Sequence, residues 1–261
     1  MIGTYVQLRA RLGVLQNARR DITNWWAWAA RQALFPLIRI PMWVRARNGA
    51  SFYLGNDGLD DAILAAALWR LEHVYFPDVS LPAAPLILDI GAHHGIVSVE
   101  YLRRYPQSSL IAVEPNPEGA ALIVRNVRGN GQMGRAEVVV AGVAEQDGPG
   151  FLHLDEEGSW GDSTRGNRDG RPGWPVRLLT LKSILAGRRP DLVKINAEGA
   201  EFITLPQLFA LGLRPRVIVA QVHAAYGSTE QLLELVRANG YASTKLPSSR
   251  SDQPYFHWVL A

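Results

Sequence analysis

The chain has 261 residues, 48% of them hydrophobic and 20% charged, which is long enough for one large α/β domain and does not indicate disorder. It contains no cysteine, so disulfides, thiolate metal sites and a cysteine nucleophile are excluded. The net charge of +3 is too small to favour a nucleic-acid partner, and none is expected.

Residues 1–43 are expected to form an N-terminal helical extension, and residues 44–261 the main domain. The aromatic side chains on one face of the extension are Trp25, Trp26, Trp28 and Phe35. This face could pack on the main domain, form a homodimer contact, close over a site as a lid or lie on a membrane surface. Polar residues interrupt the apolar stretch, so no transmembrane segment is expected. No signal peptide is recognised, and we expect a cytoplasmic protein.

Two further elements precede the central part of the chain. Residues 44–54 alternate in polarity around Asn48-Gly49, which predicts a β-hairpin. Residues 57–75 are expected to form a helix, with Asp60 and Asp61 near its start, where negative charge suits the helix dipole.

The stretch from Leu86 to Gly95 is the one around which the chain is organised. An unbroken apolar run predicts a strand buried on both faces, which reaches Asp89 and then turns through Gly91 and Gly95 into a helix over residues 96–104. Glycines allow positive φ and close approach of a ligand. The free amides at the start of the next helix favour an anionic group.

A second strand, residues 109–113, ends at Glu114, one βαβ unit after the glycine turn. At that separation an acidic side chain can accept hydrogen bonds from two ribose hydroxyls, which predicts an adenosine-containing ligand. The dehydrogenase fingerprint Gly-x-Gly-x-x-Gly is absent, because this turn has glycines only at its first and fifth positions.

Strands and helices alternate after this point, which predicts a parallel sheet covered on both faces. The further predicted strands are residues 136–140, 151–154 (antiparallel), 176–181, 191–195, 216–222, 241–246 and 255–260, and the further helices are residues 181–186, 200–211 and 229–238. The glycine-rich segment 156–173 is expected to be a functional loop, in which Trp160 could stack on a sugar ring or simply pack.

Ligands of open α/β sheets bind outside the carboxyl ends of the strands, so the residues at those ends should converge in one cleft. These residues are Asp89, Glu114, Gly142, Asn196 and His223.

The octapeptide Lys194-Ile195-Asn196-Ala197-Glu198-Gly199-Ala200-Glu201 resembles the Lys-Ile-Asp-x-Glu-Gly-Ala-Glu hallmark of the FkbM family of methyltransferases. The glycine turn resembles the first motif of methyltransferases that use S-adenosylmethionine (SAM). The resemblance covers residues 44–261. It implies a Rossmann-like, seven-stranded class I methyltransferase sheet and SAM as cofactor. It also implies a hydroxylated small-molecule acceptor, for which we favour a sugar or glycoside over a secondary metabolite.

The resemblance also implies which residues hold the cofactor. They are Asp89, Gly91, His93, Gly95, Glu114, Asn116, Gly142 and Val143. The glycine turn would hold the amino acid part of SAM, Glu114 the ribose, and the last three residues the surroundings of the adenine. Asp89 could instead only cap the turn.

Transfer to a hydroxyl needs a base near neutral pH. His93, His94 and His223 are candidates, and we favour His223, because it follows the fifth strand and the family commonly has a histidine there. It could also be a histidine satisfied by the backbone. The complete set of expected catalytic residues is His223, Asn196, Glu198 and Lys194, with Lys194 orienting the acidic residues that follow it.

At three positions where the family pattern has acidic residues, this chain has Asn196, Lys182 and Gln221 instead. Magnesium prefers anionic oxygen ligands, but Asn196 and Glu198 could still hold it. Alternatively, Asn196 and Gln221 bind a neutral polyol, and Glu198 caps its helix with Glu201. Two rival functions also follow: a nicotinamide dehydrogenase, and a SAM-binding scaffold protein without catalysis.

Overall fold

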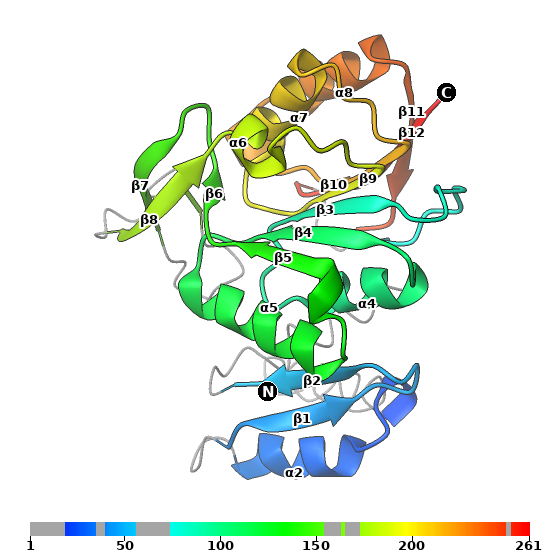
Figure 1. The fold of residues 1–261 in the computed structure, drawn as a ribbon, viewed down its shortest axis with the longest axis vertical. Helices are drawn as coiled ribbons and strands as arrows, with labels where there is room; N and C mark the ends of the chain where they lie inside the picture. Colours follow the sequence, from blue (N-terminus) through cyan, green and yellow to red (C-terminus); the bar gives the residue numbers. More distant parts are fainter. Residues whose placement is uncertain (1–18, 35–39, 56–73, 154–162, 165–172, 249–251) are drawn as a thin grey trace, which may run out of the picture.

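The computed structural model describes residues 19–34, 40–55, 74–153, 163–164, 173–248 and 252–261. Its centre is a seven-stranded sheet with the strand order β11-β12-β10-β9-β3-β4-β5 (Figure 1). The strands are β3 (Leu86–Ile90), β4 (Ser109–Val113), β5 (Ala136–Val139), β9 (Leu192–Ile195), β10 (Val217–Gln221), β11 (Tyr241–Leu246) and β12 (Tyr255–Leu260). The first five are parallel, and β12 runs antiparallel to both of its neighbours. The expected seven-stranded sheet, with its antiparallel closing pair, is confirmed.

Helices cover both faces of this sheet (Figure 1). One face carries α4 (Ile96–Arg104) and α5 (Pro117–Gly129), and the other carries α6 (Leu181–Leu185), α7 (Glu201–Ala210) and α8 (Thr229–Ala238). Successive side chains of a strand point to opposite faces. In β3, Ile87 therefore joins the core beneath α4 and α5, whereas Leu88 joins the core beneath α7 and α8. This double burial explains why every residue of the strand except Asp89 is apolar.

The chain runs outward from β3 to β4 and β5 and then returns to β9 on the other side of β3. The switch point of the sheet therefore lies between β3 and β9, where a ligand is expected. A separate three-stranded sheet contains β6 (Gly142–Val143), β7 (Gly148–Leu152) and β8 (Trp174–Leu179). The strands predicted at 151–154 and 176–181 correspond to β7 and β8, which pair antiparallel in this small sheet.

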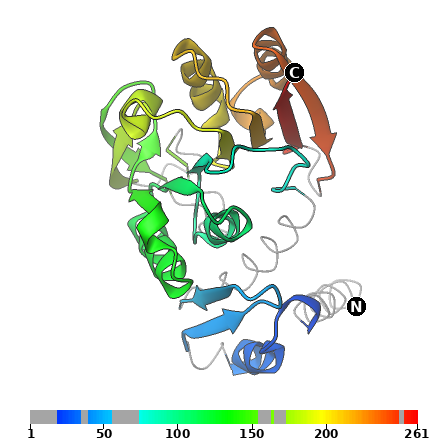
Figure 2. The same ribbon diagram turned by 45° about the vertical axis from the view of Figure 1, so that its right-hand side comes forward.

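The predicted N-terminal hairpin is confirmed as β1 (Met42–Arg45) and β2 (Ser51–Leu54). The helix α2 (Trp25–Leu34) lies on one side of it and α5 on the other (Figure 1, Figure 2). The domain boundary expected between residues 43 and 44 falls inside β1. Among the described residues, none of the helices has the length and apolarity that crossing a bilayer requires.

Some predicted elements lie outside the described residues. They are residues 1–18 of the extension, residues 57–73 of the predicted acidic-started helix, and most of the loop 156–173 with Trp160.

Candidate functional site

The glycine turn after β3 has the conformation that its sequence requires. Gly91 has φ +71° and Gly95 has φ +75°, in the left-handed region that favours glycine. A Cβ atom on Gly91 would lie 2.0 Å from the backbone oxygen of Asn196, so the turn packs directly on the chain that leaves β9. The turn therefore lies at the switch point of the sheet.

A buried ion pair supports this turn from within the sheet. Asp89 is fully buried, its Oδ1 lies 2.9 Å from Lys194 Nζ, and its Oδ2 accepts a hydrogen bond from Ser98 Oγ at 2.6 Å. Lys194 also donates to the carbonyl oxygens of Gly91 and Ile90 at 2.6 and 3.3 Å. Lys194 therefore contacts the glycine turn and Asp89. The contacts of Asp89 are with Lys194 and Ser98, so it supports the turn through Lys194 and not by capping it.

Glu114 lies directly beside the glycine turn, as predicted. It is 6% exposed, its Oε2 accepts a hydrogen bond from His93 N at 2.8 Å, and its Oε1 accepts one from Asn116 N at 2.9 Å. The side chain of Asn116 caps α5 by accepting hydrogen bonds from two backbone amides of its first turn, those of Glu118 and Gly119. The turn and the acidic residue after β4 thus converge.

The residues expected around the adenine lie farther along the chain. Glu114 N donates to Val139 O at the end of β5, and Gly142 and Val143 follow in β6 of the small sheet, where both are buried. A Cβ atom on Gly142 would lie 2.7 Å from Thr164 Cγ2. Gly142 and Val143 therefore lie in the small sheet that follows β5, and the glycine turn follows β3 of the central sheet. The residues expected around the adenine thus come from a different sheet than those expected around the amino acid part of SAM.

A carboxylate, an imidazole and a second carboxylate meet where β9 and β10 end. His223 is 1% exposed, its Nδ1 lies 3.1 Å from Glu201 Oε1, and its Nε2 lies 3.2 Å from Glu198 Oε1. Burial lowers the pKa of His223, but hydrogen bonds to the two carboxylates and their negative charge outweigh this and raise it to about 9. With this raised pKa the ring is an imidazolium at neutral pH, hydrogen-bonded to Glu201 through Nδ1 and ion-paired with Glu198 at Nε2.

Glu198 is the more accessible carboxylate of this group. Its side chain is 13% exposed, whereas that of Glu201 is fully buried. Glu198 has φ +30°, and the following Gly199 has φ +92° with the ring of Tyr226 so close that a Cβ atom would overlap it. Backbone strain of this kind in a residue other than glycine is concentrated at functional sites.

Neutral polar side chains form a second group beside Asn196. Asn196 Nδ2 donates to the Tyr75 hydroxyl at 3.1 Å, and the Tyr255 hydroxyl donates to Gln221 Oε1 at 2.7 Å. The two tyrosine rings are 6.4 Å apart at 88°. The sequence interpretation missed both tyrosines as site residues. The position of Tyr255 could have been found, because an antiparallel last strand begins at the edge where the parallel strands end.

The described residues give no support for a magnesium site. The Asn196 amide nitrogen donates to Tyr75, and Glu198 is engaged by the imidazolium of His223. Within the described part of the chain, no three acidic or histidine side chains are placed to hold a metal ion. The expectation that Asn196 and Glu198 bind magnesium is therefore not supported. A shallow hollow of about 580 Å³ lies along β7 and β8, but no predicted site residue lines it.

The family model described as the methyltransferase FkbM domain matches residues 89–243, which is more than half of the chain. This chain belongs to the FkbM methyltransferase family. The match includes the glycine turn, Glu114 and the Glu198–His223–Glu201 group, so the geometry described above is that of an FkbM domain.

Two relatives illustrate the range of similarity. Methyltransferase sdnD of Sordaria araneosa is 32% identical over 78 residues, which cover 30% of this chain and 29% of that protein. A crystal structure of methyltransferase FkbM from Methylobacillus flagellatus KT matches with a TM-score of 0.52 and 13% identity, covering 78% of this chain and 55% of that chain. The second match shows a common fold. Both matches span less than two thirds of the relative's length.

The close packing of the glycine turn can be tested with a matched pair of substitutions. Gly91 and Gly131 both have φ +71°, but nothing lies within 4 Å of a Cβ atom on Gly131. We expect Gly131→Ala to cost about 1–2 kcal/mol for the left-handed backbone alone. Gly91→Ala should cost about 2 kcal/mol more, because of the overlap with Asn196. Urea unfolding measures both, and equal costs would contradict the packing.

The charge on His223 predicts how stability depends on pH. Its pKa is raised from 6.5 to about 9, so the contribution is complete below pH 6.5 and is lost as the pH rises through about 9. We expect the free energy of unfolding of the wild type to fall across this window relative to that of His223→Gln, as measured by urea unfolding. A difference that stays constant with pH would show that His223 is not held as an imidazolium.

Proposed function

We propose that this FkbM domain is a SAM-dependent O-methyltransferase that acts on a hydroxyl group of a sugar, glycoside or secondary metabolite. The observation that carries the proposal is the meeting of Glu114 with the glycine turn at the switch point of the sheet, in a chain of this family. A sugar or glycoside is the acceptor that we favour.

The residues around the turn have the chemistry that SAM requires. The first turn of α4 begins at Gly95 and offers backbone amides to a carboxylate, as helix N-termini do. Each carboxylate oxygen of Glu114 accepts a backbone hydrogen bond in the structure, and a carboxylate can accept several hydrogen bonds, including those from ribose hydroxyls. When bound, SAM supplies an electrophilic methyl group on a positively charged sulfur.

The neutral group on the other side of the switch point supports a neutral, hydroxylated acceptor. Asn196, Tyr75, Gln221 and Tyr255 present amides and phenols, which can both donate and accept hydrogen bonds. A polyol needs this combination, whereas a charged acceptor would call for an opposite charge. Asn196 and Gln221, which stand where the family pattern has acidic residues, therefore favour a sugar over an acidic or basic acceptor.

The contacts favour Glu198 as the group that takes the acceptor's proton. The sequence singled out His223, but its pKa is raised to about 9 by the two carboxylates that lie 3.1 and 3.2 Å from its ring nitrogens, and a protonated ring has no lone pair for a proton. Glu198 is the partly exposed carboxylate, and its position is fixed by His223 and by the hydrogen bond from Ser163 Oγ to its backbone oxygen. In this proposal His223 positions Glu198 and lowers the cost of its negative charge.

Titration calorimetry with SAM and with NAD tests the choice between a methyltransferase and a dehydrogenase. We expect SAM to bind and NAD to bind much more weakly, because the turn has only two glycines and lacks the dinucleotide fingerprint. Transfer of radiolabelled methyl from SAM to a panel of sugars and glycosides tests catalysis. Tight NAD binding without SAM binding would favour the dehydrogenase. SAM binding with no transfer to any acceptor would favour the scaffold protein.

The proposed base can be tested on the same assay. We expect Glu198→Gln to lower kcat about 10²-fold or more while leaving the SAM dissociation constant unchanged, because it removes only the proton acceptor. Glu234→Gln, on the exposed face of α8, is the control and should match the wild type. A wild-type kcat in Glu198→Gln, combined with a large loss in His223→Gln, would return the role of base to His223.

A further inference from the structure

The helix α5 holds the edge of β2 with two asparagine side chains one turn apart. Asn126 Oδ1 accepts a hydrogen bond from Tyr53 N at 2.6 Å. Asn130 Oδ1 accepts one from Ser51 N at 2.9 Å, and its Nδ2 donates to Ser51 O at 2.7 Å. Residues four apart lie on the same face of a helix. The two amides thus bond to β2 as a neighbouring strand would.

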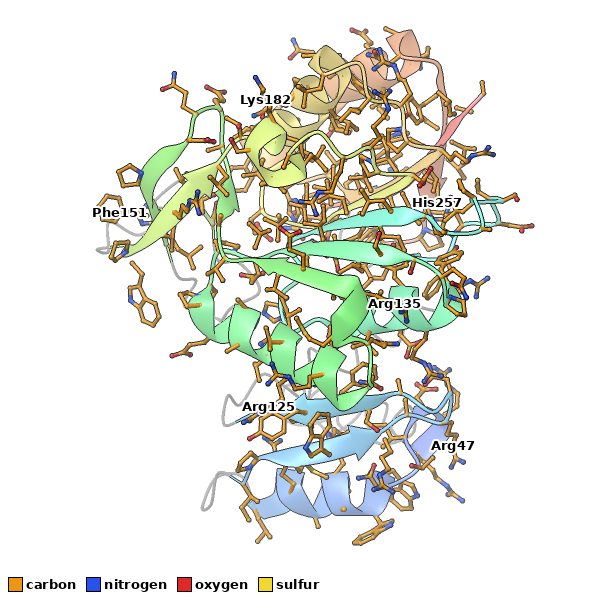
Figure 3. All side chains as sticks on the ribbon, viewed as in Figure 1. Arg47, Arg125, Arg135, Phe151, Lys182 and His257 are labelled. Atoms are coloured by element: carbon orange, nitrogen blue, oxygen red, sulfur yellow. The ribbon has the colours of Figure 1, made fainter. Side chains whose placement is uncertain are left out.

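An arginine reinforces this junction from the same helix. The guanidinium carbon of Arg125 lies 4.1 Å from the centre of the Tyr53 ring, and Figure 3 shows Arg125 where α5 meets the hairpin. A cation this close to an aromatic face is attracted to it. The hairpin is therefore fixed to α5 by side chains rather than only by apolar packing.

Asn126 differs from Asn130 in what its amide nitrogen does. Asn126 Nδ2 donates to the backbone oxygen of His94 at 2.7 Å, whereas Asn130 Nδ2 donates, besides Ser51, to the backbone of its own helix. Asn126 is fully buried. His94 is part of the glycine turn and immediately precedes Gly95, the N-cap residue of α4. One buried amide therefore joins the hairpin to the turn.

The glycine turn is thus held at both ends. Lys194 binds the carbonyl of Gly91 at its beginning, and Asn126 binds the carbonyl of His94 at its end. Between them, His93 N donates to Glu114. A buried carbonyl that loses a strong donor becomes costly and will turn toward another partner. Removing the Asn126 amide should therefore release the half of the turn that leads into α4.

We propose that Asn126 is a positioning residue for the cofactor, and that it makes cofactor binding depend on the docked N-terminal hairpin. The inference rests on the proposed SAM binding. The side chain acts through the glycine turn, since its two partners are the backbone of His94 and the backbone of Tyr53. Ordering of the turn by SAM should in turn strengthen the docking of the hairpin, because such coupling is reciprocal.

Calorimetry with SAM on three variants tests this inference. Asn126→Asp keeps the acceptor for Tyr53 and loses the donor to His94, and Asn126→Ala loses both. Asn130→Ala is the matched control, because it also loosens β2 but does not contact the turn. We expect both Asn126 variants to raise the SAM dissociation constant about tenfold or more. The SAM dissociation constant of Asn130→Ala should stay within about twofold of the wild-type value, even if this variant loses as much stability as the Asn126 variants.

Hydrogen exchange on the wild type gives a second measurement that does not depend on how the variants fold. We expect saturating SAM to slow exchange of the Tyr53 amide more than that of the Ser51 amide, because only the first is bonded to Asn126. Equal SAM affinity in wild type and folded Asn126 variants, or an unchanged Tyr53 amide, would overturn the inference alone. Failure of the wild type to bind SAM would overturn the proposed function as well.

Discussion

The rest of the site depends on the buried ion pair between Asp89 and Lys194. The two residues are direct partners in the pairing of β3 with β9, and both are almost completely buried. Burying two charges is costly unless each is also hydrogen-bonded. Here Ser98 bonds to the carboxylate, and two carbonyl oxygens, one of them that of Gly91, accept from the ammonium group. The pair therefore fixes the end of β3 in one conformation.

The fixed turn divides the site into two halves. On the β4 side it contacts Glu114, and on the β9 side it contacts the backbone of Asn196, beyond which Glu198 and His223 follow. Neighbouring strands are about 4.8 Å apart, so these groups can face one ligand pair across the switch point. A displacement reaction needs such alignment of donor and acceptor, and a rigid sheet supplies it without further ordering.

Much of the fold could be predicted from the sequence, because apolar runs and turn residues are local signals. The strands at 109–113, 241–246 and 255–260 and the helix at 229–238 have the predicted bounds. The partners of buried polar side chains could not be predicted. Lys194 pairs with Asp89 because of the register between β9 and β3, and no local pattern encodes that register. The partners of Asn126 are backbone groups, which have no sequence signature.

Asn196 and Gln221 stand where the family pattern has acidic residues. The charges around them explain why uncharged side chains there are compatible with the proposed chemistry. Asp89 is paired with Lys194, and Glu198 and Glu201 share the single imidazole of His223. Further carboxylates in place of Asn196 and Gln221 would add negative charge in a largely buried region, where like charges repel strongly. The amides keep hydrogen bonds to the two tyrosines without adding charge. Hydrogen bonding without added charge is what the neutral, hydroxylated acceptor proposed above requires.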